Sequence, residues 1–325
     1  MFRISRISIS IFISLIFCFS SVLAFEKVGT TSFQFLKVMT DARSTGMAGA
    51  YTAVTDKSDA VFWNPASLIN IAKFDAQISY LDYFLDVRHS SVSAAWTFNG
   101  LGTFGVQGII TDVGEIEVTT VDALGFIGDV YNPGLTGETI NPTSLVLGLS
   151  FARGITDKFA FGITGKFVRE DLVVARKNLF MFDGGILYRT GFHSLELAAA
   201  LKNFGSEVKY YEDGYPLPQT LKLGISGYIF SPTENIVNTS ENHSLLISFD
   251  LVQPRDYDQQ YSIGSEYGFK NLIFLRGGYK LNFDEESFAA GMGVLFKNYR
   301  FDYSFNDFGE YLDALHRFSF GVEIK

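Results

Sequence analysis

The sequence predicts an all-β protein: a transmembrane antiparallel β-barrel of about 14 strands with a short helical N-terminal hatch in the lumen. Three observations predict it. From about residue 74 to the C-terminus, large apolar residues alternate with small or polar residues in runs closed by turn residues. The 325-residue chain is 47% hydrophobic and 16% aromatic but only 19% charged. After residue 25 there is no run of 18 uninterrupted apolar residues, so the sequence predicts no transmembrane helix there.

Residues 1–24 have the layout of a secretory signal peptide. Two arginines precede an apolar segment at 7–19, and Ala24 is the small residue expected at the cleavage site. The alternative is a retained membrane anchor, but serines interrupt this segment, and it is short for a hydrocarbon layer of about 30 Å. Cleavage would remove Cys18, the single cysteine of the sequence, and with it any thiol catalysis.

Residues 25–73 are expected to form the hatch. The stretch at 33–70 lacks the strand alternation, and its length suits short helices that fill the mouth of a barrel too wide for its own side chains to fill. The alternative is a loose periplasmic tail. The residues that mark the candidate hatch motif are Gly46, Gly49, Trp63, Asn64 and Pro65.

Residues 74–325 are expected to form the barrel. In the run at 157–169, one face carries Phe159, Phe161, Ile163 and Phe167, and the other carries Ala160, Gly162, Thr164, Lys166 and Val168. In a soluble sandwich the apolar faces would pack together, but so many faces need a core larger than single domains build, whereas a membrane barrel turns them to lipid. The expected strands are 74–82, 88–98, 102–112, 143–153, 157–169, 178–189, 194–202, 219–230, 244–252, 259–268, 272–281, 287–296, 299–305 and 316–324.

The connections support a barrel because short and long ones alternate along the chain. Asn99-Gly100 is a typical two-residue hairpin turn. The long loops at 113–142 and 203–218 are expected on the outer face. The segment at 231–243 is an exception: it is a long connection on the short side, and is either a periplasmic excursion or a miscounted hairpin.

Charge and motif spacing exclude several kinds of function. The formal net charge is −9, and the basic residues are scattered, so we expect no nucleic acid partner. We expect no metal site, because the histidines show no ligand spacing; they are His89, His193, His243 and His316. We also expect no cofactor and no enzymatic activity, since no nucleophile elbow or phosphate-binding loop occurs.

Two alternatives remain open for polar residues of the barrel. A hydrolase could combine a serine and a histidine from the strands, and the candidate pairs are Ser319 with His316 and Ser244 with His243. Charged residues at positions facing the lumen could select solutes or could pair with one another inside a plugged lumen. These residues are Lys166, Asp183, Arg189, Glu266, Arg276 and Lys280.

The hatch segment also carries a family resemblance. Its stretches are Ala42-Arg43, Gly46-Met47-Ala48-Gly49-Ala50-Tyr51-Thr52-Ala53-Val54 and Asp59-Ala60-Val61-Phe62-Trp63-Asn64-Pro65-Ala66-Ser67-Leu68. They resemble the N-terminal signature of the PorV/PorQ family, within the larger group typified by the FadL fatty-acid transporters. The sequence departs from this signature at Ala48 and Ser67, where the family usually has glycine.

The resemblance implies a fourteen-stranded barrel with an N-terminal hatch in the outer membrane of a Gram-negative bacterium. It also implies an accessory role in type IX-like protein secretion, in which secreted cargo or secretion-system subunits bind at the outer face. Aromatic residues of the outer loops would then be the contacts, although they could equally be ordinary loop aromatics near the lipid headgroups. These residues are Phe126, Tyr131, Tyr210, Tyr211 and Tyr215.

The alternative function is a FadL-like channel that passes small hydrophobic compounds when the hatch moves. Trp63, Asn64 and Pro65 would then lie near the gate. The two functions differ in their partners, since one requires secreted proteins and the other a small hydrophobic ligand.

Overall fold

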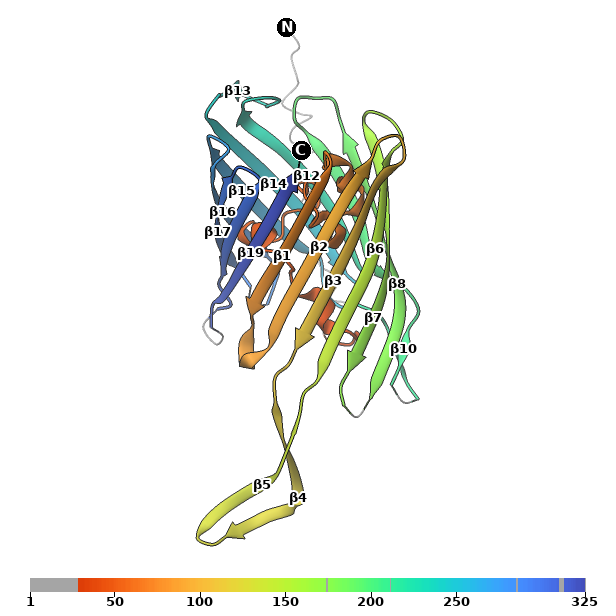
Figure 1. Cartoon of the computed structure of the whole chain (residues 1–325), viewed down its shortest axis with the longest axis vertical. Helices are drawn as coiled ribbons and strands as arrows, with labels where there is room; N and C mark the ends of the chain where they lie inside the picture. The colour runs from red at the N-terminus through yellow and green to blue at the C-terminus, as the bar shows by residue number, and fades with distance from the viewer. Residues whose placement is uncertain (1–28, 174, 211, 285, 310–312, 325) are drawn as a thin grey trace, which may run out of the picture.

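A computed structural model shows a closed antiparallel β-barrel (Figure 1). The structure describes residues 29–324 except 174, 211, 285 and 310–312, so the expected signal peptide lies outside the described residues. The wall closes where β19 pairs with β1 and β9 pairs with β12. The fourteen wall strands in the described residues are β1 (Phe74–Asp82), β2 (Arg88–Phe98), β3 (Gly102–Asp112), β6 (Thr143–Gly154), β7 (Phe159–Asp171), β8 (Arg176–Arg189), β9 (Glu196–Phe204), β12 (Thr220–Ser231), β14 (His243–Pro254), β15 (Gln260–Phe269), β16 (Ile273–Leu281), β17 (Phe288–Phe296), β18 (Tyr299–Asn306) and β19 (Leu315–Ile324).

The predicted fold class is confirmed. β1, β2 and β3 have the bounds expected from the sequence, and every other wall strand begins and ends within two residues of its expected bounds. The strands were predictable because each turns an apolar face outward and a polar face to the lumen, and this imposes a period of two on the sequence.

The wall is apolar outside and polar inside. On β19, for example, Phe318 is 48% exposed on the outer face, whereas Arg317 and Ser319 are each 3% exposed and face the lumen. The other wall strands have the same alternation of exposed and buried positions. An outer surface of this kind is stable against lipid rather than water. None of the described helices is long and apolar enough to cross a membrane.

The two ends of the barrel differ in their connections. We call the end with the short connections, such as 99–101 and 297–298, the turn end, and the opposite end the loop end. A long hairpin formed by β4 (Ile116–Ile127) and β5 (Val130–Ile140) projects from the loop end far beyond the wall (Figure 1).

This hairpin corrects the expected loop at 113–142. Its pairing register shifts between Glu117 and Thr119 and again between Thr119 and Leu124. Most residues of both strands are exposed, so no buried face imposes the regular alternation by which the wall strands were predicted.

Two other connections contain short strands. The expected loop at 203–218 includes a small hairpin of β10 (Val208–Lys209) and β11 (Gly214–Tyr215). The segment at 231–243 includes β13 (Asn238–Thr239), which pairs in parallel with β12 at the turn end. It is therefore an excursion beside the wall and not a miscounted hairpin.

Short helices before β1 occupy the lumen (Figure 1). They are η1 (Gln34–Lys37), α2 (Ala42–Gly46), α3 (Ala60–Trp63) and η2 (Pro65–Asn70), and a further turn, η3 (Phe84–Asp86), connects β1 to β2. Asp41 caps α2 by accepting a hydrogen bond from the backbone N–H of Ser44 at 2.8 Å. Asn64 caps η2 in the same way, and Pro65 fixes its first turn.

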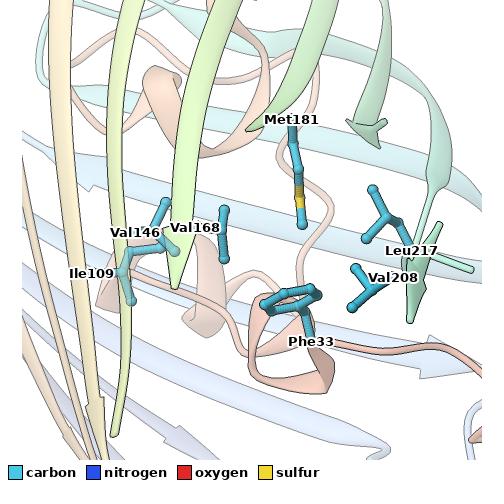
Figure 2. Close-up of a cluster of buried hydrophobic side chains, with 7 residues drawn as sticks. All are labelled: Phe33, Ile109, Val146, Val168, Met181, Val208 and Leu217. Atoms are coloured by element: carbon cyan, nitrogen blue, oxygen red, sulfur yellow. The ribbon is translucent and has the colours of Figure 1, made fainter. Parts of the chain in front are cut away.

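The segment before α2 packs against the wall near the loop end. Figure 2 shows the ring of Phe33 between two groups of side chains, one from the wall and one from the 205–218 connection. The buried cluster consists of Phe33, Ile109, Val146, Val168, Met181, Val208 and Leu217. This packing holds Phe33, and with it the start of η1, against the wall near the loop end.

Candidate functional site

A cavity of about 540 Å³ lies between the lumen helices and the loop end of the barrel. This volume is within the range of ligand pockets. The exposed area of its lining is mainly apolar, with contributions from the segment at 36–39, the hatch residues Phe62 and Trp63, and the loop-end rings of Phe84 and Phe308. Wall strands complete the lining with both apolar and polar side chains. The turn-end side of the cavity is closed by the hatch, so a ligand in this cavity would rest on Phe62 and Trp63.

Trp63 is held rigidly at the floor of this cavity. Its Nε1 donates a hydrogen bond to Oδ2 of Asp41 at 2.8 Å, and its ring packs edge-on to Tyr51 with 5.7 Å between the ring centroids. The Nζ atom of Lys222 lies 4.2 Å from the centroid of the ring, which is a cation–π contact. Because Asp41 also caps α2, Trp63 joins two of the hatch helices.

Asn64 and Pro65 fix the hatch to the barrel wall. The Asn64 side chain donates to the backbone oxygens of Thr52 at 3.2 Å and of Ile186, on β8, at 3.1 Å. Glycines of the wall make this contact possible, because a Cβ atom at Gly162 would overlap Pro65 and one at Gly185 would overlap Asn64. The hatch motif is thus in van der Waals contact with the backbone of β7 and β8.

Steric and backbone constraints also explain why the hatch motif has glycine at two positions. A Cβ atom at Gly46 would lie 3.0 Å from the Cα atom of Gly291 on β17, and Gly49 has a φ of +75°. Ala48, one of the two departures from the family signature, has a φ of +54°. The left-handed backbone there explains why glycine suits this position, and alanine bears a strain.

A chain of buried ion pairs connects the hatch to the wall. Arg43 forms a two-pronged contact with Glu266, at 2.8 and 2.9 Å. Glu266 in turn pairs with Arg276 at 2.6 Å, and Arg276 pairs with Asp302 at 2.7 Å. Beyond Asp302 the chain continues to Arg300, whose Nη1 lies 3.1 Å from Oδ2 of Asp75. Of the wall charges expected at lumen positions, Glu266 and Arg276 therefore pair with each other, and Glu266 also pairs with the hatch.

Two other wall aspartates hold turns of the hatch. Asp250 accepts hydrogen bonds from the N–H groups of Tyr51 and Thr52 and from the Thr52 hydroxyl, at 3.1, 2.9 and 2.6 Å. Asp75 accepts from the N–H and the hydroxyl of Ser58 at 2.8 and 2.6 Å. These carboxylates satisfy backbone groups that a lumen segment would otherwise leave unpaired.

Two acidic groups of the hatch, Asp56 and Asp59, have displaced pKa values. Although burial alone would raise it, the Arg43 guanidinium holds the pKa of the Asp56 carboxyl well below its usual range. Burial, and then the charge of Asp41, raises the pKa of Asp59 from 3.8 to about 8. Oδ2 of Asp59 accepts from the Tyr51 hydroxyl at 3.0 Å, while Oδ1 is buried without a hydrogen-bond partner among the described residues. Burial therefore favours the protonated form of the Asp59 carboxyl.

Four lysines of the wall line the cavity: Lys166, Lys202, Lys222 and Lys280. Asp183 is shared by two of them, with 2.7 Å to Lys166 and 3.0 Å to Lys202. The sequence singled out Lys166, Asp183 and Lys280 by their position on the lumen side, but not Lys202 or Lys222. The same alternation on β9 and β12 would have identified both.

The expected outer-loop aromatic residues form two groups. Phe126 and Tyr131 lie at the tip of the β4–β5 hairpin, are 73% and 56% exposed, and have ring centroids 5.5 Å apart. Tyr210 contacts Tyr215, at 6.1 Å between centroids, and its hydroxyl donates to Glu170 of β7. Tyr211 lies outside the described residues.

The candidate serine–histidine pairs are not brought together. Ser319 faces the lumen, where its hydroxyl contacts Ala42 N–H, whereas His316 is on the outer face and contacts the Tyr303 hydroxyl at 2.7 Å. His243 contacts the Tyr267 hydroxyl at 2.6 Å, and no hydrogen bond to Ser244 is found among the described residues. In the described part of the chain, no group of three or more His, Cys, Asp and Glu residues is placed to hold a metal ion.

Comparison with known proteins identifies relatives by structure alone. No protein-family description matches the sequence, and no curated protein has a matching sequence. The Ralstonia pickettii toluene transporter TbuX matches with a TM-score of 0.57 and 14% identity, over 89% of this chain and 99% of TbuX. The chain shares the fold of FadL-type outer-membrane transporters.

Two further structures have this FadL-like fold. The Pseudomonas putida toluene transporter TodX matches with a TM-score of 0.55 and 13% identity, over 87% of this chain and 96% of TodX. A Pseudomonas aeruginosa FadL homologue matches with a TM-score of 0.54 and 11% identity, over 88% and 98% of the two chains. The match to these transporters shows the fold, and the narrower PorV/PorQ resemblance stays a prediction.

Proposed function

We propose that this protein is a channel for small hydrophobic compounds in the outer membrane of a Gram-negative bacterium, exported by a signal peptide that is cleaved after Ala24. The observation that carries the proposal is the apolar cavity, which the hatch closes on one side inside a lipid-facing wall. A cavity of this volume with an apolar lining and a few polar groups is the usual form of a small-molecule site. The toluene transporters TbuX and TodX share the fold, so toluene is the first compound to test.

Passage through this channel requires the hatch to move, because Phe62 and Trp63 stand between the cavity and the turn end. The hatch is fixed to the wall at Glu266, Asp250 and Asp75 through hydrogen bonds. Breaking one such bond, with hydrogen bonds to water formed in its place, has a net free-energy cost of about 0.5 to 1.5 kcal/mol. The cost is somewhat greater when one partner is charged. We propose that ligand entry shifts the hatch at these contacts while the wall stays intact.

Fluorescence of Trp63 tests the proposal. The sequence has two tryptophans, and Trp96 is on the outer face, so a Trp96→Phe variant leaves Trp63 as the reporter. Toluene added to this variant in detergent should change its emission saturably. A Val252→Phe change fills the cavity and should weaken toluene binding, whereas Ile247→Phe, on the outer face of the same strand, should not. An emission that does not respond to toluene contradicts the proposal.

The second candidate function is the docking of secreted cargo or secretion-system subunits at the β4–β5 hairpin. The tip exposes Phe126 and Tyr131, and the residues at 113–142 include acidic but no basic side chains. An exposed apolar tip on an acidic stem is typical of a surface that binds a partner with basic residues. The aromatic pair at Tyr210 and Tyr215 would extend this surface.

Removal of the hairpin separates the two candidates. Asp112 and Thr143 are paired neighbours in the wall, so a short turn can replace the hairpin without changing β3 or β6. If the hairpin docks cargo, the full-length barrel should capture secreted proteins that share a C-terminal β-domain, and the shortened barrel should not. Equal capture by both, or by neither, excludes docking at the hairpin, and toluene binding should be the same in both proteins.

A further inference from the structure

Arg317 differs from the other buried arginines of the lumen. Arg43, Arg276 and Arg300 each pair with a carboxylate. Arg317 is only 3% exposed, and its Nε and Nη1 atoms have no hydrogen-bond partner among the residues that the structure describes. A buried guanidinium without a directly paired carboxylate is costly, since each unpaired charge in a protein interior loses its hydration.

Unsatisfied polar groups flank Arg317 in one row across the wall. Ser304 lies beside Arg317 on β18, and Leu81 lies beside it on β1, followed by His89 on β2. The Ser304 hydroxyl and His89 Nε2 are both buried and, within the described part of the chain, have no hydrogen-bond partner. His89 Nδ1 contacts the Thr111 hydroxyl at 2.9 Å, which fixes the ring. Arg317 is thus one of three neighbouring residues with free hydrogen-bonding capacity.

Arg317 also lines a second cavity of about 300 Å³ that adjoins the first. The two cavities share the residues at 37–39 and the rings of Tyr83 and Phe308, which pack edge-on with 6.4 Å between centroids. Glu286 is the acidic residue of this lining, and it is already paired with Lys280. Among the described residues, the cavity therefore combines aromatic walls with one guanidinium that forms no ion pair.

We propose that Arg317 binds the carboxylate of a small aromatic acid, whose ring lies against Tyr83 and Phe308. The inference rests on the proposed function, because it names the class of compound that this channel takes. A planar carboxylate matches the two parallel N–H groups of a guanidinium, which a point charge does not. Water would satisfy the hydrogen bonds but would leave the guanidinium without a directly paired anion, and a hydrated inorganic anion would gain nothing from the aromatic walls.

The test compares benzoate, benzamide and toluene as probes, because they share one ring and differ in charge. Binding is measured by calorimetry on the detergent-solubilised full barrel. Benzoate should bind saturably to the unchanged protein, and Arg317→Gln should weaken its binding at least about tenfold, since a charge-assisted pair is lost. Arg317→Lys should recover part of the affinity. Arg153→Gln, which removes an exposed charge near the turn end, is the matched control and should leave benzoate binding unchanged.

Neutral probes separate charge recognition from cavity shape. Toluene and benzamide should bind equally well to the unchanged protein and to Arg317→Gln, and the heat-dependent gel mobility of a folded barrel verifies that the variant is intact. The proposal is overturned if Arg317→Gln binds benzoate normally, if it loses benzoate and toluene to the same extent, or if sulfate displaces benzoate at equal concentration. A protein that binds toluene but not benzoate overturns this inference and leaves the proposed channel standing, whereas one that binds neither contradicts both.

Discussion

Single residues of the hatch combine structural and electrostatic constraints. Asp41 caps α2 and accepts from Trp63, while the nearby Asp59 shares the same buried region. Two carboxylates so close together cannot both ionise at low cost, so one of them takes up the proton. The raised pKa of Asp59 follows from its burial and from this neighbour, and it makes the hatch sensitive to pH.

We predict that the hatch becomes less stable as the pH rises from about 4 to 8. The Asp59 carboxyl has a pKa of about 8 in the folded protein, against 3.8 for the ordinary group. Between these values the folded hatch binds more protons than the unfolded one, so its stability falls with increasing pH. Asp59→Asn should remove this dependence and make the hatch more resistant to proteolysis at pH 8.5. Asp86→Asn, at an exposed loop-end position, is the control, and an unchanged pH profile in Asp59→Asn would contradict the prediction.

At the scale of the element, the hatch and the wall strands fit each other by close backbone contact. Pro65 and Asn64 lie where β7 and β8 have glycines at lumen positions. The neighbouring Gly184 has no atoms around the position of an added Cβ. Two consecutive glycines of one strand therefore have different roles, because successive residues point to opposite faces.

We predict that Gly185→Ala loosens the hatch whereas Gly184→Ala does not. The added methyl group at 185 would overlap the Asn64 side chain, and forcing atoms into a packed interior costs about 1 to 3 kcal/mol. Limited proteolysis of the hatch should therefore be faster in Gly185→Ala, with the wall still folded. Equal rates for the two variants would show that Asn64 does not depend on this contact.

At the scale of the whole molecule, the barrel has a polar interior and an apolar outer face that requires lipid. Ile163 is near the middle of β7 and is 50% exposed on this face. Phe192 is in a connection at the turn end, close to water. The same polar substitution should therefore have a different cost at the two positions.

We predict that Ile163→Arg destabilises the barrel in lipid vesicles more than Phe192→Arg does. An arginine at the middle of the membrane costs about 2 to 4 kcal/mol, and the cost falls to about 0 to 1 kcal/mol near the interface. Reversible unfolding of the two variants in vesicles measures the difference. Similar unfolding free energies would contradict the assignment of the outward face to lipid.

The sequence was sufficient for the wall but not for the site. Each wall strand has its own alternation, so residues such as Phe318 and Arg317 indicate their faces locally. The β4–β5 hairpin lacks this signal because it projects beyond the wall and most of its residues on both faces are exposed. The cavity depends on the packing of Phe33, at the start of η1, against the wall and the 205–218 connection. These segments are far apart in the sequence, so local patterns do not predict the contact. The lack of an ion pair at Arg317 among the described residues was likewise unpredictable. Arg300 on β18 also lies at a lumen position of the alternation, yet it pairs with a carboxylate.

The pairing of β1 with β19 has a consequence for the order of assembly. The seam of the cylinder joins the beginning and the end of the wall, so it cannot seal before the last strand has been made. The hatch precedes β1 in the chain, and once the seam is sealed no gap between strands remains through which a bulky helical segment could slip. A hatch that reaches the lumen between strands must therefore enter while the sheet is still an open ribbon. A hatch peptide supplied separately to a finished hatchless cylinder would arrive too late to take its place by that route.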